Sequence, residues 1–294
     1  MKEYLARLQT VYDMNEARSI LRMLLEDAFG LSWVDVCLGA LERMDASERE
    51  RLEGMVAELE KGRPVQYVTG KAWFGERTFH VEEGVLIPRP ETEMLTKNLF
   101  DKTGVSANES IGEGRVGDRP TVLDIGCGSG CIAITVALDY PEAKVTAWDI
   151  SDDALAIAAG NAGMMGAKVE FVKQDALNAP EDDVEKWDVI VSNPPYICNK
   201  EVAEMEKNVL DYEPHLALFV PDDDPLLFYR RIAEYGLHAL KPGGHLRFEI
   251  NSAYGKETVQ LLESLGYEDV ALQKDEFRND RIVGAVMRNN HKTF

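Results

Sequence analysis

The sequence predicts an α/β protein in which a small helical part precedes a parallel sheet flanked by helices. Three observations support this fold class. Residues 1 to 61 have helical periodicity, with apolar residues such as Leu21 and Leu25 on one helix face. Residues 64 to 90 are rich in aromatic and β-branched residues with turn glycines. From Thr121 onward, short apolar strands alternate with helical segments, as in parallel sheets.

Helix-ending and helix-capping residues divide the helical part. Gly30 is expected to end one helix, and Ser32 is expected to cap the next. Ser47 with Glu50 has the spacing of a capping box, which predicts a further helix that ends at Gly62. The pattern is that of a small helical bundle.

The segment between the two parts predicts a β-hairpin. Trp73-Phe74-Gly75 and Thr78-Phe79-His80-Val81 have the composition of two short strands with a turn. A short helix is expected from about Glu91 to Lys102, and the segment from Gly104 to Pro120 reads as a surface loop.

Five strands are expected in the sheet. They are Thr121 to Ile125, Lys144 to Trp148, Val169 to Val172, Asp188 to Val191 and His245 to Ile250.

Composition limits the kinds of partner. The 294 residues carry a formal net charge of -20, which repels phosphate backbones and anionic lipids, so neither nucleic acid nor a membrane is expected as a partner. The longest uncharged stretch near the middle, Ile125 to Leu138, is too short to span a bilayer. The four cysteines are too sparse for a disulfide scaffold, which favours a reducing cytoplasm; they are Cys37, Cys127, Cys131 and Cys198.

A glycine-rich turn follows the first predicted strand. Gly126-Cys127-Gly128-Ser129-Gly130 is placed where open α/β sheets bind ligands, at a strand's carboxyl end. Cys131 stands where a dinucleotide fingerprint has its third glycine, and no Gly-Lys-Ser/Thr follows to hold phosphates. The turn therefore fits neither NAD nor a nucleoside triphosphate.

The acidic residues around this turn favour S-adenosylmethionine. Asp124 flanks the uncharged loop, which suits a ligand with a cationic amino group and a sulfonium. Asp149 closes the second strand, where a carboxylate can accept both ribose hydroxyls, and Asp175 ends the third strand, near the expected adenine amine. The alternative is that the glycines only make a turn and the aspartates only cap helices. Cys127 and Cys131 are expected to pack rather than bind a metal, since structural zinc takes four ligands.

The fourth strand leads into Asn193-Pro194-Pro195-Tyr196. Prolines have no backbone N–H, so this rigid turn leaves carbonyl oxygens free to accept hydrogen bonds. The Asn193 side-chain oxygen and the Pro194 carbonyl suit the two hydrogens of a planar NH₂ group, with Tyr196 packed against the flat acceptor. Methyl transfer to an amide or amino nitrogen needs positioning more than a strong base, so no catalytic histidine is expected. The alternative is an ordinary turn.

These motifs together resemble the peptide chain release factor N5-glutamine methyltransferase family, whose members modify the glutamine of the release factor Gly-Gly-Gln loop. The resemblance covers nearly the whole chain. Further matching segments are Pro64-Val65-Gln66-Tyr67 with Gly70, Val85 to Glu93, Asp211-Tyr212-Glu213-Pro214 with Ala217-Leu218, Gly243-Gly244 and Asn279-Asp280-Arg281.

The resemblance implies a Rossmann-like, seven-stranded class I S-adenosylmethionine methyltransferase domain with one antiparallel strand. A β-hairpin is expected to join it to a small N-terminal helical-bundle domain. The implied limits are residues 1–72 for the helical domain, which helps to grip the release factor, 73–90 for the hairpin linker and 91–294 for the methyltransferase domain.

The resemblance also implies the site and the reaction. Gly126 to Gly130, Asp149 and Asn193 are expected to contact the cofactor, and Asn193 to Tyr196 to hold the substrate glutamine. At Ala176, in the expected adenine pocket, relatives often carry a bulky aromatic residue. The implied enzyme methylates the N5 nitrogen of the Gly-Gly-Gln glutamine, with release factors as partners. We expect it to act in the cytoplasm as a monomer.

Three other functions are weighed against this one. A sister enzyme methylates a glutamine of a ribosomal protein and characteristically has Ser-Pro after the arginine that corresponds to Arg89, where this chain has Pro90 and Glu91. An adenine-N6 methyltransferase of DNA or RNA also acts on a planar NH₂ group, but the net charge of -20 argues against it. A non-catalytic scaffold is disfavoured by the intact segment from Asn193 to Tyr196.

Overall fold

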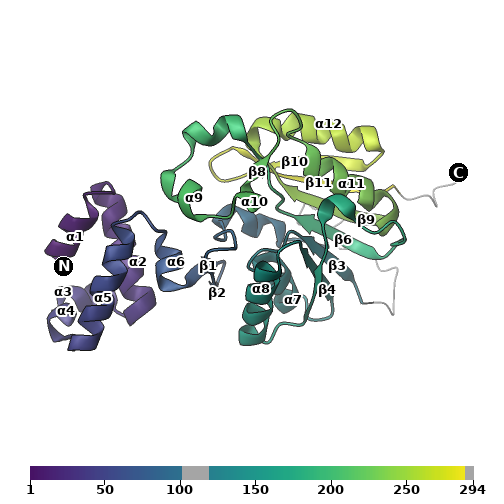
Figure 1. Cartoon of the computed structure of the whole chain (residues 1–294). Helices are drawn as coiled ribbons and strands as arrows, with labels where there is room; N and C mark the ends of the chain where they lie inside the picture. The colour runs from purple at the N-terminus through teal and green to yellow at the C-terminus, as the bar shows by residue number, and fades with distance from the viewer. Residues whose placement is uncertain (101–118, 289–294) are drawn as a thin grey trace, which may run out of the picture.

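The computed structural model describes residues 1–100 and 119–288, and it begins with the predicted helical bundle (Figure 1). Apolar side chains from these helices form a core of their own, which includes Leu21, Leu25 and Val56. The helices are α1 (Lys2–Leu8), α2 (Met14–Phe29), α3 (Trp33–Cys37), α4 (Ala40–Arg43), α5 (Ala46–Leu59) and α6 (Val65–Thr69).

The helix caps agree with the sequence at one place and differ at another. Gly30 ends α2 with φ +66°, and Ser32 caps α3, as predicted. The capping box predicted at Ser47 is wrong, because α5 begins two residues earlier. There the Asp45 side chain accepts the Glu48 N–H at 2.8 Å, and Glu48 accepts the Asp45 N–H at 3.0 Å.

The predicted hairpin consists of β1 (Lys71–Phe74) and β2 (Arg77–His80), which pair antiparallel. It is tied to the sheet region by Asn161, whose side chain is fully buried. Asn161 Oδ1 accepts the N–H of His80 at 2.7 Å, and its Nδ2 donates to the carbonyls of His80 (3.0 Å) and Ser129 (2.9 Å). One side chain thus connects the hairpin to the glycine turn.

The central sheet has seven strands in the order β10-β11-β9-β6-β3-β4-β5. All five predicted strands are present, although β9 begins five residues earlier than expected, and β11 runs antiparallel to both of its neighbours, β10 and β9. This confirms the seven-stranded fold that the resemblance implied. The strands are β3 (Thr121–Ile125), β4 (Lys144–Asp149), β5 (Val169–Lys173), β6 (Trp187–Ser192), β9 (Leu240–Glu249), β10 (Glu268–Lys274) and β11 (Asp280–Val286).

Helices cover both faces of the sheet (Figure 1). Because successive side chains of a strand point to opposite faces, Val122 packs in the core under α7 (Cys131–Asp139) and α8 (Asp152–Met165). Its neighbour Leu123 packs in the opposite core, under α11 (Leu227–Ala239) and α12 (Gly255–Leu265).

Short elements complete the chain between these strands and helices. The predicted helix after Glu91 is instead a 3₁₀ helix that ends at Leu95. Most of the segment from Gly104 to Pro120 lies outside the described residues. The short elements are η1 (Pro90–Leu95), η2 (Ala176–Asn178), β7 (Ile197–Cys198), η3 (Asn199–Glu204), α9 (Lys207–Tyr212), α10 (His215–Leu218), β8 (Phe219–Val220) and η4 (Ser252–Tyr254).

The strand order reverses beside β3, which positions the site. From β3 the chain continues to β4 and β5 on one side, then returns to β6 on the other. Ligands of open α/β sheets bind at such a reversal, beyond the carboxyl ends of the strands. Within residues 1–100 and 119–288, no helix has the length and hydrophobicity needed to span a bilayer.

Replacement of Gly130 by alanine is expected to destabilise the fold by about 2–4 kcal/mol. Gly130 has φ +81°, and an added Cβ would lie 2.9 Å from Ile134 Cδ1 and 3.0 Å from Ala158 Cβ, where α7 approaches α8. Gly160→Ala is the control, because Gly160 lies within α8 with no heavy atom within 4 Å of an added Cβ. That variant is expected to gain about 0.5–1 kcal/mol. Urea unfolding measures the free energy of unfolding of both variants. Equal changes in Gly130→Ala and Gly160→Ala would contradict the packing argument.

Candidate active site

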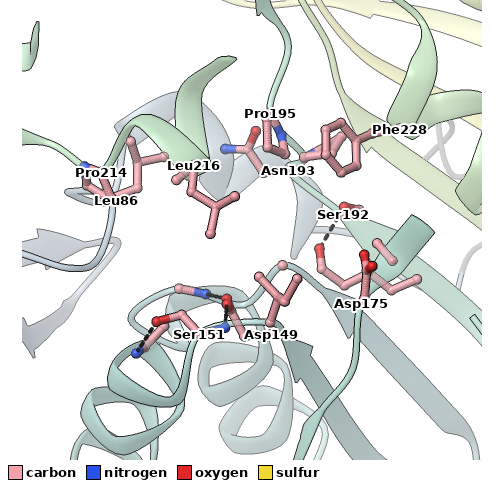
Figure 2. Close-up of a pocket in the computed structure, with 18 of the residues that line it drawn as sticks. Leu86, Asp149, Ser151, Asp175, Ser192, Asn193, Pro195, Pro214, Leu216 and Phe228 are labelled. Atoms are coloured by element: carbon pink, nitrogen blue, oxygen red, sulfur yellow. Dashed lines mark hydrogen bonds between the residues drawn. The ribbon is translucent and has the colours of Figure 1, made fainter. Parts of the chain in front are cut away.

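A cavity of about 380 Å³ lies at the carboxyl ends of β3, β4, β5 and β6. Figure 2 shows Asn193 and Pro195 across the open centre of this cavity from Asp149 and Ser151, with Asp175 and Phe228 on one side and Leu86 and Leu216 on the other. The predicted site residues on its wall are Gly126, Gly128, Asp149, Asp175, Ala176, Asn193, Pro194 and Pro195.

The glycine turn leaves backbone open to this cavity. The N–H groups of Gly126 and Cys127 both donate to the Trp148 carbonyl at 2.9 Å, which joins the turn to β4. Gly126 and Gly128 have φ +77° and +52°, and no heavy atom lies within 4 Å of a Cβ added at either. Glycine is therefore required for conformation, and the space beside both residues is available to a ligand.

Asp149 links the glycine turn to the start of α8. Its Oδ2 accepts the Gly128 N–H at 2.9 Å, and its Oδ1 accepts the Ser151 N–H at 2.9 Å. Since each carboxylate oxygen has two lone pairs, one acceptor site remains on each oxygen. Asp149 can thus accept two further hydrogen bonds while the protein holds its orientation.

The far side of the cavity is acidic at its edge and apolar within. Asp175 caps η2 by accepting the Leu177 N–H at 2.8 Å. Ala176 lies beside it, and α11 adds Phe228 and Ile232. The sequence patterns did not single out Phe228, because its place beside Ala176 depends on the packing of a helix more than fifty residues further along the chain.

Four predicted cofactor residues do not line the cavity: Asp124, Cys127, Ser129 and Gly130. Asp124 is fully buried behind the turn, where its Oδ2 accepts the Ala133 N–H at 3.1 Å. Burial, together with the nearby Asp149, raises the pKa of Asp124 to about 7. Its side chain thereby links β3 to the first turn of α7, which follows the glycine turn. Cys127 is also buried, and the described residues contain no group of three or more His, Cys, Asp or Glu placed to hold a metal ion.

The turn from Asn193 to Tyr196 separates two cavities. Asn193 lines the first cavity and also a second one of about 220 Å³, which Tyr196 and Arg89 line as well. Within the described ranges, no backbone N–H is hydrogen-bonded to the carbonyl of Pro194. This arrangement gives Asn193 access to two ligands at once.

Tyr196 is held by a buried carboxylate. Its hydroxyl donates to Glu249 Oε1 at 3.1 Å. Burial and the nearby Glu249 raise the pKa of the Tyr196 hydroxyl above its ordinary value. Tyr196 therefore keeps its proton and serves to shape the second cavity.

The residues of the first cavity fit S-adenosylmethionine. Its volume lies in the range of small-molecule pockets, roughly 300–1,000 Å³. The open space beside Gly126 and Gly128 admits a ligand close to the backbone, the free acceptor sites of Asp149 suit ribose hydroxyls, and the apolar wall beside Ala176 suits a flat base.

Comparisons with known proteins agree with this chemistry. Residues 114–211 match the methyltransferase small domain, and residues 1–70 match the PrmC N-terminal domain. A release factor glutamine methyltransferase of Bacteroides thetaiotaomicron is 45% identical over 95% of both chains. Proteins of the same name from Flavobacterium psychrophilum and Bacillus subtilis are 40% and 35% identical, over 97% and 98% of this chain and 97% and 93% of their own.

Asp124 predicts a pH-dependent stability in the cofactor-free protein. Because its pKa is raised from 3.8 to about 7 on folding, the folded state holds the proton more tightly, and stability falls as pH rises through this window. Relative to Asp124→Asn, the wild type is expected to lose about 3 kcal/mol between pH 4 and pH 7. Urea unfolding of both proteins across this pH range measures the difference in their free energies of unfolding. A difference that does not change with pH would contradict the prediction.

Proposed function

The chain belongs to the family of release factor glutamine methyltransferases, and from this premise we propose which of its residues perform the reaction. The enzyme transfers a methyl group from S-adenosylmethionine to the side-chain N5 nitrogen of a release factor glutamine, that of the Gly-Gly-Gln motif. The observation that carries the proposal is the place of Asn193 on both cavities.

Asn193 and Pro194 bind and orient the substrate amide. The Asn193 Oδ1 and the Pro194 carbonyl accept the two hydrogens of the glutamine NH₂ group, so that its nitrogen faces the first cavity. An amide nitrogen is a weak nucleophile, and positioning is the main contribution that the protein makes. Hydrogen bonds that strengthen as the nitrogen becomes tetrahedral favour the transition state. Pro195 stiffens the turn, and Tyr196 packs beside the glutamine from the second cavity.

The first cavity holds the cofactor, which when bound supplies an electrophilic methyl group. Gly126 and Gly128 would let it approach the backbone, and Asp149 would accept hydrogen bonds from its ribose hydroxyls. Asp175 and Ala176 would line the part of the cavity that takes its adenine. Four residues that do not line the cavity fix the shape of the glycine turn from its buried side. They are Asp124, Cys127, Ser129 and Gly130.

The N-terminal helices bind the release factor. We divide the chain into a helical recognition domain (1–72), a hairpin linker (73–90) and a methyltransferase domain (91–294). Support comes from Tyr67 in α6, whose hydroxyl donates to the Val85 carbonyl at 2.6 Å. Val85 lies on the wall of the first cavity, so the helical domain contacts the segment that borders the site.

The enzyme acts as a cytoplasmic monomer without a nucleic acid or membrane partner. The net charge of -20 opposes binding to phosphate backbones and anionic lipids. The four cysteines have no disulfide bonds, which suits a reducing compartment.

Substrate choice is tested with labelled S-adenosylmethionine and, separately, release factor, ribosomal protein and DNA. Label is expected on the release factor alone. A release factor in which the Gly-Gly-Gln glutamine is replaced by alanine is the control and is expected to stay unlabelled. Label on ribosomal protein or DNA at a comparable rate would contradict the assignment.

Asn193→Ala and Asp149→Ala are expected to separate catalysis from cofactor binding. Loss of a transition-state hydrogen bond in Asn193→Ala lowers kcat on the order of 10²–10³-fold and weakens cofactor binding less. Loss of the ribose acceptor in Asp149→Ala raises KM for S-adenosylmethionine about 10–100-fold. Steady-state kinetics with calorimetric cofactor binding measures both. Wild-type kcat in Asn193→Ala would refute its role.

A further inference from the structure

A chain of hydrogen bonds runs from Asn193 into the protein interior. Asn193 Nδ2 donates to Thr92 Oγ1 at 3.2 Å, and Thr92 Oγ1 donates to Glu249 Oε2 at 2.5 Å. The Glu249 side chain also accepts from Tyr196, as described above. Thr92 and Glu249 are 3% and 1% exposed, so neither is free to exchange these partners for water.

We propose that Thr92 and Glu249 are positioning residues that fix which end of the Asn193 amide faces the substrate. The inference rests on the proposed role of Asn193 Oδ1 as an acceptor for the glutamine NH₂ group. An asparagine amide has a donor end and an acceptor end of nearly equal size, so packing alone distinguishes them poorly.

The direction of the hydrogen bonds decides the amide orientation. Thr92 has a single hydroxyl proton, and it is donated to Glu249 Oε2. The Thr92 oxygen is then only an acceptor toward Asn193, and it can bind the NH₂ end but not the oxygen end. Oδ1 is thereby directed away from Thr92 and is left for the substrate.

The surrounding structure holds this chain in place. Thr92 lies on η1, which Arg247 of β9 fastens by donating to the carbonyls of Met94 (3.1 Å) and Lys97 (2.7 Å). Burial raises the pKa of Glu249, and the hydrogen bonds from Thr92 and Tyr196 together with the positive charge of Arg281 limit that rise.

Two substitutions interrupt the chain of hydrogen bonds at different points. Thr92→Val preserves the branched shape but removes the hydroxyl. Glu249→Gln preserves the size but offers an NH₂ donor, which lets the Thr92 proton turn toward Asn193. Thr92→Ser retains the hydroxyl and is the conservative rescue. Thr96→Val is the matched control, because Thr96 is buried just after η1 and its hydroxyl donates to the Glu93 carbonyl, at 2.9 Å.

The experiment measures kcat and KM with release factor, and the Kd of S-adenosylmethionine by calorimetry, for each variant. Thr92→Val and Glu249→Gln are each expected to lower kcat on the order of 10–100-fold. The Kd should change by less than about 3-fold, since the chain acts on the acceptor side. Thr92→Ser and Thr96→Val should stay within about 3-fold of wild-type kcat. The double variant Thr92→Val/Glu249→Gln should have a kcat no lower than that of the slower single variant, because both substitutions act through the same chain of hydrogen bonds.

Specific results would overturn the inference. A wild-type kcat in Thr92→Val would do so. A loss of kcat in Thr92→Ser as large as that in Thr92→Val would also do so, because it would assign the effect to packing. A loss of cofactor affinity as large as the loss of kcat would assign it to a general disturbance of the cavity. If Asn193→Ala is inactive but Thr92→Val is not, only the positioning role fails. If Asn193→Ala is active, the proposed role of Asn193 fails and the inference fails with it.

Discussion

The parallel pairing of β3 with β6 sets Ile125 opposite Ser192, and the rest of the site depends on this register. The Ser192 hydroxyl donates to the Ile125 carbonyl at 2.6 Å, which fastens the two strand ends together. Both strands leave the sheet at the same edge, one into the glycine turn and the other into Asn193. A slip of one residue would turn each side chain to the opposite face and would separate the two turns.

Around this pair, the protein buries polar groups that a stable core does not require. Glu249 and Thr92 lie in the interior, and Glu213 is almost fully buried with Arg89 as its partner at 2.6 Å. Burial of a carboxylate costs free energy unless hydrogen bonds and an opposite charge offset it. Their common feature is a hydrogen bond to a residue that lines a cavity: Thr92 with Asn193, Glu249 with Tyr196 and Glu213 with Arg89.

The pairing of Glu213 with Arg89 also explains two segments that the resemblance picked out. Glu213 accepts the Ile87 N–H at 3.2 Å in addition to its contact with Arg89. The segment that follows the hairpin is thereby joined to the segment that borders the second cavity. These matching segments lie far apart in sequence and meet in the folded chain.

The sequence by itself determined the fold class, the strand that carries each turn and the chemistry of both turns. Those properties follow from local patterns: strand periodicity, glycines that permit positive φ, and prolines that lack an N–H. Local patterns placed the cap of α5 two residues late, because Asp45 with Glu48 and Ser47 with Glu50 both have the spacing of a capping box. They also grouped Asp124 with the cofactor residues, since adjacency to the turn does not reveal on which side of the strand a side chain is buried.

Only the tertiary structure decided which distant residues complete the site. Phe228 reaches the cavity through the packing of α11, and Thr92 meets Asn193, which lies 101 positions further along the sequence. No periodicity encodes such contacts, because they depend on the strand order and on how each helix lies against the sheet. The chemistry of the two turns is local and can be read along the chain, whereas the orientation of the Asn193 amide is set by partners that only folding brings together.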